Sequence, residues 1–294
     1  MSTIPADQLT RIGVVHKVKT WWMMIRISLE ERLAYRGDFA LGTLMRFLPI
    51  ITQIFLWGAI FNAVAAQSGS DEANPPTLGG YALPDMVAYF LMTMIARAFS
   101  SMPGLASGIA SQVRQGEIKK YLIQPVDLIS FLLCTRIAHK LAYYVVATLP
   151  FAFVFFLCRG FFTAGFPPPV YFVAFLGSLV MGFMIGFFLE ATIGLISFWL
   201  LEVNSLLLIF MLFSFFLSGH MFPLSLLPPD IEWIVNLLPL KYLAYFPAAI
   251  FLQKIPEDEL AAEMAIEAGW VVFFIITCRW MYQRGLKRYS GFGG

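Results

Sequence analysis

Charged side chains are scarce in this chain of 294 residues. They make up 13% of the sequence, whereas hydrophobic residues make up 59% and the mean hydropathy is +0.76. Soluble domains contain about 25% charged residues, and no soluble fold of this length could bury so much apolar surface. The small net charge of +2 also argues against nucleic acid as a partner, because nucleic-acid-binding proteins carry a concentrated basic patch. The composition therefore indicates an all-α, polytopic membrane protein.

Residues and motifs typical of catalytic or metal-binding sites are also few. The sequence contains three cysteines and three histidines, without a disulfide or metal-ligand spacing. There is no G-x-x-x-x-G-K-[ST], so the chain lacks the phosphate-binding loop of ATPases, and it has neither G-x-S-x-G nor H-E-x-x-H. We predict that the chain is not an enzyme and binds no cofactor or metal. If ATP drives its function, the ATP is bound and hydrolysed by a separate subunit.

Long apolar stretches predict six membrane-spanning helices, because about 20 apolar residues cross the hydrocarbon core. Before them, residues 1–38 are predicted to form an amphipathic helix in the membrane interface, with apolar residues at helical spacing among basic ones. The transmembrane domain then covers residues 39–294. Within it, residues 218–251 hold several prolines between short apolar pieces and are predicted to form a re-entrant helical hairpin in the outer leaflet. The six spans are expected at 47–66, 84–112, 141–158, 170–197, 204–217 and 269–282.

Lys and Arg predict the orientation, because loops rich in these residues stay in the cytoplasm. The loop after the first span carries Asp71 and Glu72 and no Lys or Arg, so it is predicted to lie outside. The protein is predicted to lie in the cytoplasmic (inner) membrane of the cell. The same assignment places both termini in the cytoplasm. Three cationic residues fall outside, namely Arg159, Lys241 and Lys254. Fourteen fall inside, namely Arg11, Lys17, Lys19, Arg26, Arg32, Arg36, Arg114, Lys119, Lys120, Arg136, Lys140, Arg284, Lys287 and Arg288.

The cytoplasmic segment 114–127 has a pattern that suits the docking of a soluble subunit. Gly116 permits a break after the long second helix, a short helix follows, and Pro125 ends it. A short rigid helix between two spans could transmit a push from a soluble motor to the membrane helices. The alternative interpretation is an ordinary basic cytoplasmic loop, and spacing alone does not separate the two.

Two ionisable residues are predicted within spans, Arg97 in the second and Glu190 in the fourth. Charged groups in hydrocarbon are costly, so they usually face a bundle interior, a partner or water. By position along their helices the two differ in depth by roughly 10 Å, at 1.5 Å per residue. One hypothesis is that Arg97 faces the transport path or a dimer axis, paired with Glu190. The other is that each residue only fixes helix packing.

The order and membrane placement of these features resemble the permease subunits of ABC transporters of the type-2 exporter family. The motif G-E-x(4)-L-x-x-P lies between the second and third spans, and S-G-x-x-F-P-x-x-x-L-P follows the fifth. By this resemblance, the first motif implies an ATPase-coupling role for Gly116, Glu117, Leu122 and Pro125. The second implies that the outer hairpin contains Ser218, Gly219, Phe222, Pro223, Leu227, Pro228, Pro239 and Tyr242.

The resemblance also implies partners. The chain is expected to pair with a second permease, identical or paralogous, and with two copies of an ABC ATPase subunit, and to export a substrate by ATP-driven rearrangement. Two other classes remain open from the residues alone: an ion-coupled secondary transporter, which commonly shows an inverted repeat, and a non-transporting membrane scaffold subunit. An intramembrane enzyme would need clustered acidic or histidine side chains, which Glu190 alone does not supply. The sequence points to no particular cargo.

Overall fold

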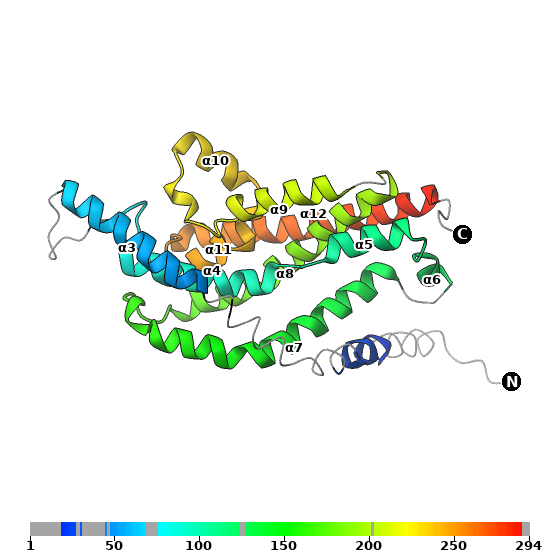
Figure 1. The fold of residues 1–294 in the computed structure, drawn as a ribbon, viewed down its shortest axis with the longest axis horizontal. Helices are drawn as coiled ribbons and strands as arrows, with labels where there is room; N and C mark the ends of the chain where they lie inside the picture. Colours follow the sequence, from blue (N-terminus) through cyan, green and yellow to red (C-terminus); the bar gives the residue numbers. More distant parts are fainter. Residues whose placement is uncertain are drawn as a thin grey trace. The chain divides into compact units, whose positions relative to one another are not determined.

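The structure is a computed structural model that describes residues 19–27, 30, 45, 48–68, 76–123, 127–200 and 203–289. Within these ranges the regular elements are all helices, and one isolated bridge joins Leu78 to Tyr81, which confirms the all-helical class. The longer helices are α3 (Leu48–Ser68), α4 (Leu83–Ser100), α5 (Leu105–Arg114), α7 (Leu128–Leu157), α8 (Pro169–Leu195), α9 (Asn204–Leu217) and α12 (Glu257–Arg288), labelled in Figure 1. The shorter ones are α6 (Lys119–Leu122), η1 (Arg159–Phe161), η2 (Ile196–Phe198), η3 (Leu224–Leu226), α10 (Pro229–Leu237), η4 (Pro239–Leu243) and α11 (Tyr245–Phe251).

The chain divides into two compact units, which we describe separately. The first comprises residues 1–46 and 119–153, and the second comprises 47–118 and 154–294. In the first unit, Asp127 begins α7: its carboxylate accepts hydrogen bonds from the backbone N–H and the hydroxyl of Ser130, both at 2.8 Å. Of the predicted N-terminal interfacial helix, residues 19–27 are helical and include exposed Trp21 and Trp22. Most of the remainder of 1–38 lies outside the described residues.

Among the described residues, four helices are long and apolar enough to cross a membrane, at Leu48–Gln67, Leu128–Val145, Pro169–Phe198 and Glu257–Arg288. Three of them match or include the first, fourth and sixth predicted spans. The candidate at Leu128–Val145 overlaps the third predicted span, 141–158, only at its end, because α7 begins at Leu128, earlier than expected. The fifth, α9, has the predicted bounds, but at 14 residues it is shorter than a full crossing. The count of six spans therefore stays a prediction.

The second predicted span is not continuous to residue 112, so this expectation was wrong. Helix α4 ends at Ser100 and α5 begins at Leu105. The cause is local: Pro103 disfavours helical backbone at the residue before it, and Gly104 takes a left-handed conformation with φ of 72°. The sixth predicted span, 269–282, lies within a longer helix, α12, which begins at Glu257. Its first turn holds Glu257, Asp258 and Glu259, which stabilise the positive end of the helix dipole.

Helix α8 is the centre of the second unit and packs against α4, α5, α11 and α12. It carries Gly182, Gly186 and Gly194 at intervals of four and eight residues, which places them toward one side of the helix. A Cβ atom added at Gly182 would lie 2.9 Å from the Tyr242 carbonyl oxygen, and one at Gly194 would lie 2.8 Å from the Ala106 carbonyl oxygen. At Gly186 it would overlap the carbonyl of Ser100. Three segments therefore approach the α8 backbone directly, as small residues allow between membrane helices.

Gly104 and Gly108 have the same four-residue spacing but behave differently. A Cβ atom at Gly104 or Gly108 would meet nothing within 4 Å among the described residues. The four-residue spacing alone therefore does not identify a packing surface. It does so on α8, where the backbone of a neighbouring segment fills the space that a side chain would need.

The contact between Gly186 and Ser100 gives the first prediction. Gly186→Ala should destabilise the protein by about 1–3 kcal/mol, because the backbone of Ser100 cannot move away as a flexible side chain could. Gly108→Ala is the matched control in a helix interior, and it should be neutral or stabilising by up to about 1 kcal/mol, since alanine favours helix. Denaturant unfolding of the full-length chain in detergent micelles measures both. Equal stability of the two variants would contradict the close approach.

Candidate functional site

The predicted break at Gly116 is present and is held by backbone hydrogen bonds. Gly116 is left-handed, with φ of 75°. Its N–H donates to the carbonyl of Val113 at 3.3 Å, and the N–H of Glu117 donates to the carbonyl of Gln112 at 3.0 Å. This pair of bonds is the Schellman motif, which ends a helix and sets the direction of the chain that follows. The end of α5 is therefore fixed rather than frayed.

Beyond this break the chain presents charged and apolar groups to its surroundings. Glu117, Lys119 and Lys120 are exposed, and Ile118 is buried. Ile123, which follows α6, is 85% exposed, which is unusual for an isoleucine outside lipid. Leu122 ends α6, but its side chain and all of Pro125 lie outside the described residues. Sequence reasoning did not single out Ile123; its exposure depends on where α6 ends.

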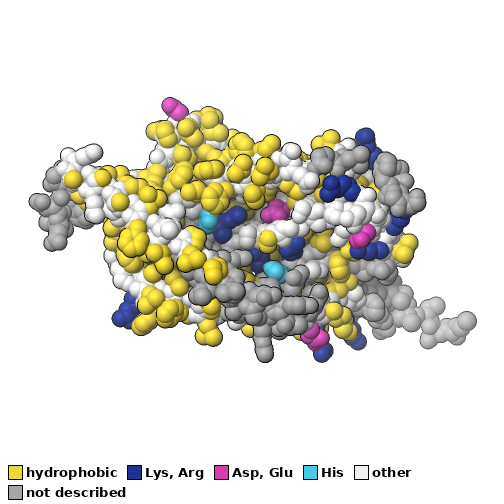
Figure 2. Space-filling view, viewed as in Figure 1, with side chains coloured by type: hydrophobic (Ala, Val, Ile, Leu, Met, Phe, Trp, Pro, Cys, Tyr) yellow, Lys and Arg dark blue, Asp and Glu magenta, His cyan; other side chains and the backbone are white. Residues whose placement is uncertain are grey.

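The structure brings Arg97 and Glu190 together, and it adds His220. Arg97, on α4, interacts electrostatically with Glu190, on α8, and with His220, which follows α9. Burial, and next the positive charge of Arg97, lower the pKa of His220 to about 4. Figure 2 shows His, Lys or Arg, and Asp or Glu side chains close together on a face otherwise rich in hydrophobic ones.

The register of α4 against α8 explains how this pair forms. Ser100 lies beside Gly186, so Arg97 is about one turn to one side of this contact and Glu190 about one turn to the other. Two turns correspond to roughly 10 Å along the axis, the separation that the sequence predicted. Despite this offset, Arg97 and Glu190 interact electrostatically.

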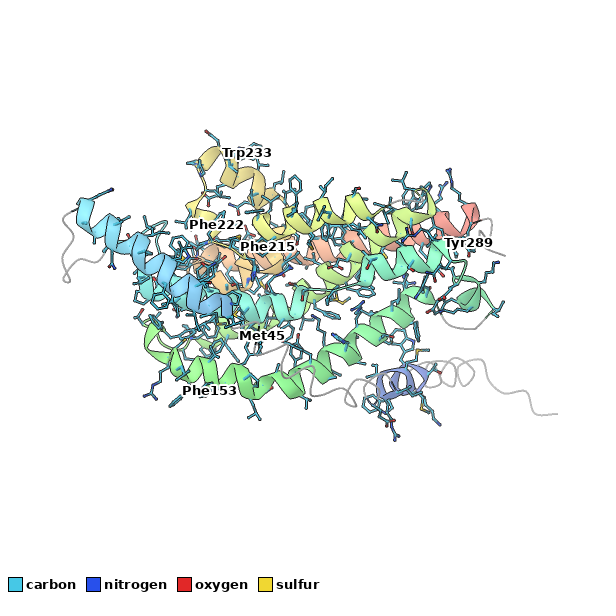
Figure 3. All side chains as sticks on the ribbon, in the orientation of Figure 1. Met45, Phe153, Phe215, Phe222, Trp233 and Tyr289 are labelled. Atoms are coloured by element: carbon cyan, nitrogen blue, oxygen red, sulfur yellow. The ribbon has the colours of Figure 1, made fainter. Side chains whose placement is uncertain are left out.

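The first residues of the outer hairpin motif make contacts through their backbone. Gly219 has φ of 75°, and a Cβ atom there would lie 2.6 Å from the Cβ of Tyr245. The hydroxyl of Tyr89, on α4, donates to the carbonyl of Gly219, and the carbonyl of Ser218 accepts from the N–H of Tyr245 at 2.9 Å. Phe222, labelled in Figure 3, offers its carbonyl to the same Tyr89 hydroxyl at 3.5 Å. The start of the hairpin is therefore attached to α4 and α11.

Prolines divide the rest of the hairpin into short helices. Pro223, Pro228 and Pro239 precede or begin η3, α10 and η4, where a residue without a free N–H is tolerated. The segment 218–251 contains the α-helices α10 and α11 and the 3-10 helices η3 and η4. Helix α10 exposes Trp233, at 64%, which points away from the helix in Figure 3. Its other exposed apolar residues are Ile231, Ile234 and Leu237.

Sequence reasoning missed a buried polar cluster where η4 meets α8 and α12. Lys241 forms an ion pair with Glu263 at 2.9 Å, and the Tyr242 hydroxyl donates to the same carboxylate oxygen at 3.1 Å. One turn further along α12, Glu267 is fully buried and accepts a hydrogen bond from Ser178 at 3.1 Å. The four-residue spacing of the two glutamates was visible in the sequence. The partners were not, because they come from distant segments.

Comparison with known families identifies the class of protein. The family model described as ABC-2 family transporter protein matches residues 47–293. Because the match covers most of the chain, the protein belongs to this family, whose members are membrane components of transport systems. The resemblance inferred from the sequence is thereby confirmed. A comparison with curated proteins found no match.

The Arg97–Glu190 interaction gives the second prediction. Arg97→Met removes a counter-charge from Glu190 and should lower the free energy of unfolding by about 2–5 kcal/mol. The double variant Arg97→Met, Glu190→Gln removes both charges and should recover most of this loss. Unfolding of the wild type, both single variants and the double variant forms a double-mutant cycle. Strictly additive losses would contradict an interaction between the two side chains.

Proposed function

We propose that the chain is the permease subunit of an ATP-driven exporter, with six spans and both termini in the cytoplasm. It works as a dimer with an identical or paralogous permease, and ATP is bound and hydrolysed by two ABC ATPase subunits. Family membership supports the class of transporter, and the scarcity of Lys and Arg in the predicted outer loops supports the orientation. The ATPase docks on segment 114–127, and the outer hairpin 218–251 closes the path at the outer side.

One structural feature supports this assignment most directly: a continuous series of contacts leads from the docking segment to the hairpin. Helix α5 ends at the fixed turn at Gly116, and Ala106 near its start lies against Gly194 of α8. At the other end of α8, Gly182 lies against the backbone of Tyr242 in the hairpin. A displacement of α5 therefore reaches the hairpin through one rigid helix.

Within the docking segment, Glu117 and Ile123 are the residues that we assign to the contact with the ATPase. Both are exposed, one charged and one apolar, and they flank α6. The ATPase would bury Ile123 in an apolar pocket, and a basic group of the ATPase would pair with Glu117. Leu122 and Pro125 belong to the same segment by their place in the motif.

Helix α10 fits a position in the outer leaflet. It exposes four large apolar residues around a short helix that also carries Asp230 and Glu232, and Trp233 is of the type enriched at the membrane–water interface. A helix of this kind lies at the boundary between lipid and water. The transport path then contains Arg97, His220 and Glu190. Arg97 and Glu190 carry opposite charges, so the pair is neutral overall and can lie within the membrane.

The third prediction tests the orientation. The three native cysteines are buried, so they give little background when the protein is labelled. Lys120→Cys and Glu257→Cys each place a new thiol at an exposed position, one on the predicted inner side and one on the outer side. In intact cells a membrane-impermeant maleimide should label Glu257→Cys only, and both variants after the cells are opened. Labelling of Lys120→Cys in intact cells would overturn the assigned topology.

The fourth prediction tests the docking segment. Replacing Glu117 by Lys together with Ile123 by Asp should abolish copurification of an ATPase subunit, because both contacts become unfavourable. Leu237→Asp on α10 is the matched control: it replaces another exposed apolar residue, on the predicted outer side, and should leave copurification unchanged. The ATPase bound per permease is measured by quantitative protein staining of the purified complex. Retention of the ATPase by the docking-segment variant would contradict the proposal.

A further inference from the structure

The polar cluster at the base of the hairpin contains more negative than positive charge. It brings together two carboxyl groups, Glu263 and Glu267, and one ammonium group, Lys241, which is itself nearly fully buried. Lys241 is the cation that acts on both glutamates. Its ion pair and the hydroxyl of Tyr242 satisfy Glu263. The positive charge of the cluster, on Lys241, is therefore already paired with one of the two carboxyl groups, that of Glu263.

Glu267 is left with a single hydrogen bond. Its side chain has 0% exposure, Oε1 accepts from the hydroxyl of Ser178, and Oε2 has no hydrogen-bond partner among the described residues. An ionised carboxylate in such a place has neither water nor a full set of donors, which makes its burial very costly. A neutral carboxylic acid fits the same contacts, with Oε1 as the carbonyl acceptor and the proton on Oε2.

Within the part of the chain that the structure describes, Lys241 is the cation that acts on Glu267, and the other neighbours do not supply a second one. Helix α8 presents the neutral Ser178 to Glu267, and α11 contributes Tyr245, which acts on Glu263. The remaining neighbours are Lys241 and Tyr242 from η4 and Glu263 from α12 itself. All the groups that the structure places around Glu267 therefore leave the cluster one positive charge short.

We propose that the junction of α8, η4 and α12 is a proton-binding site, in which Glu267 holds one proton while η4 is packed in place. When η4 moves away from α12, water reaches the carboxyl group, and the O–H bond breaks to give the carboxylate and a hydrated proton. Opening of the hairpin thereby releases one proton, and closing takes one up. If the hairpin is the outer gate, as in the proposed function, each transport cycle exchanges a proton with the outer solution.

The proton itself can be detected by infrared spectroscopy of the full-length chain in phospholipid nanodiscs at neutral pH. A protonated carboxyl group has a carbonyl band separate from that of a carboxylate. We expect such a band in the wild type, its loss in Glu267→Gln, and its retention in Glu259→Gln, a matched change at an exposed position on the same helix. Identical bands in the wild type and Glu267→Gln would overturn the proposal.

Two further measurements test whether the infrared band belongs to Glu267 and whether a proton, and not a metal cation, is bound there. Ser178→Ala keeps Glu267 and removes its hydrogen bond, so the band should shift in frequency and remain; an unshifted band would mean that the carboxyl group responsible is a different one. Replacing potassium chloride by sodium chloride or choline chloride should leave the band unchanged. Loss of the band in sodium chloride would show that a metal cation, and not a proton, balances the cluster, and would overturn the proposal.

Hydrogen exchange tests the link to movement of the hairpin. If opening releases one proton, the opening equilibrium should shift up to tenfold per pH unit. After correction for the intrinsic pH dependence of exchange, the protection of backbone amides in 239–251 should fall by up to this factor as pH rises in the wild type, and stay constant in Glu267→Gln. Equal pH dependence in both would contradict the link. Neither measurement needs an ATPase or a substrate, so failure here would leave the proposed function standing.

Discussion

The fold depends on how closely other segments approach the backbone of α8. Gly182, Gly186 and Gly194 lie on one side of this helix, and each accepts a backbone carbonyl where a side chain would otherwise be. In lipid there is little hydrophobic drive between helices, so such close packing supplies much of the attraction. The three contacts also fix the positions of the polar groups. Glu190 lies on the same side between Gly186 and Gly194, so its meeting with Arg97 follows from the register of α4 on α8.

The sequence predicted what depends on local chemistry. The bounds of α9, the helix end at Gly116 and the hairpin turn at Gly219 follow from apolar runs and from glycine's freedom to adopt a positive φ. The break after Ser100 was equally local, since Pro103 and Gly104 marked it, but the apolar pattern on both sides suggested a single span. An apolar run shows where lipid can be, and it does not show whether the helix within it is continuous.

The remainder depended on partners distant in the chain. Spacing placed Glu263 and Glu267 on one side of a helix, but nothing in it revealed that Lys241, Tyr242 and Ser178 complete their surroundings. Acidic residues just before a span usually face water, so the sequence alone suggests solvent exposure for both glutamates. Burial reverses that interpretation for Glu267. The same limit explains why one pair of glycines forms a packing surface and another with the same spacing does not.

The two ends of α8 are joined to their neighbours by different kinds of contact. At one end, Gly194 meets α5 through backbone packing, which transmits displacement and has no dependence on charge. At the other, Ser178 and Gly182 meet α12 and η4 beside the cluster of Lys241 and the glutamates, where separation requires buried charges to find water. The backbone packing at Gly194 loosens gradually as the two segments separate. The contacts around Lys241 separate only at a threshold, because partial separation leaves charges neither paired nor hydrated. A push delivered at the α5 end would therefore accumulate along the rigid helix until the polar junction opens, which is the behaviour expected of a gate with two distinct states.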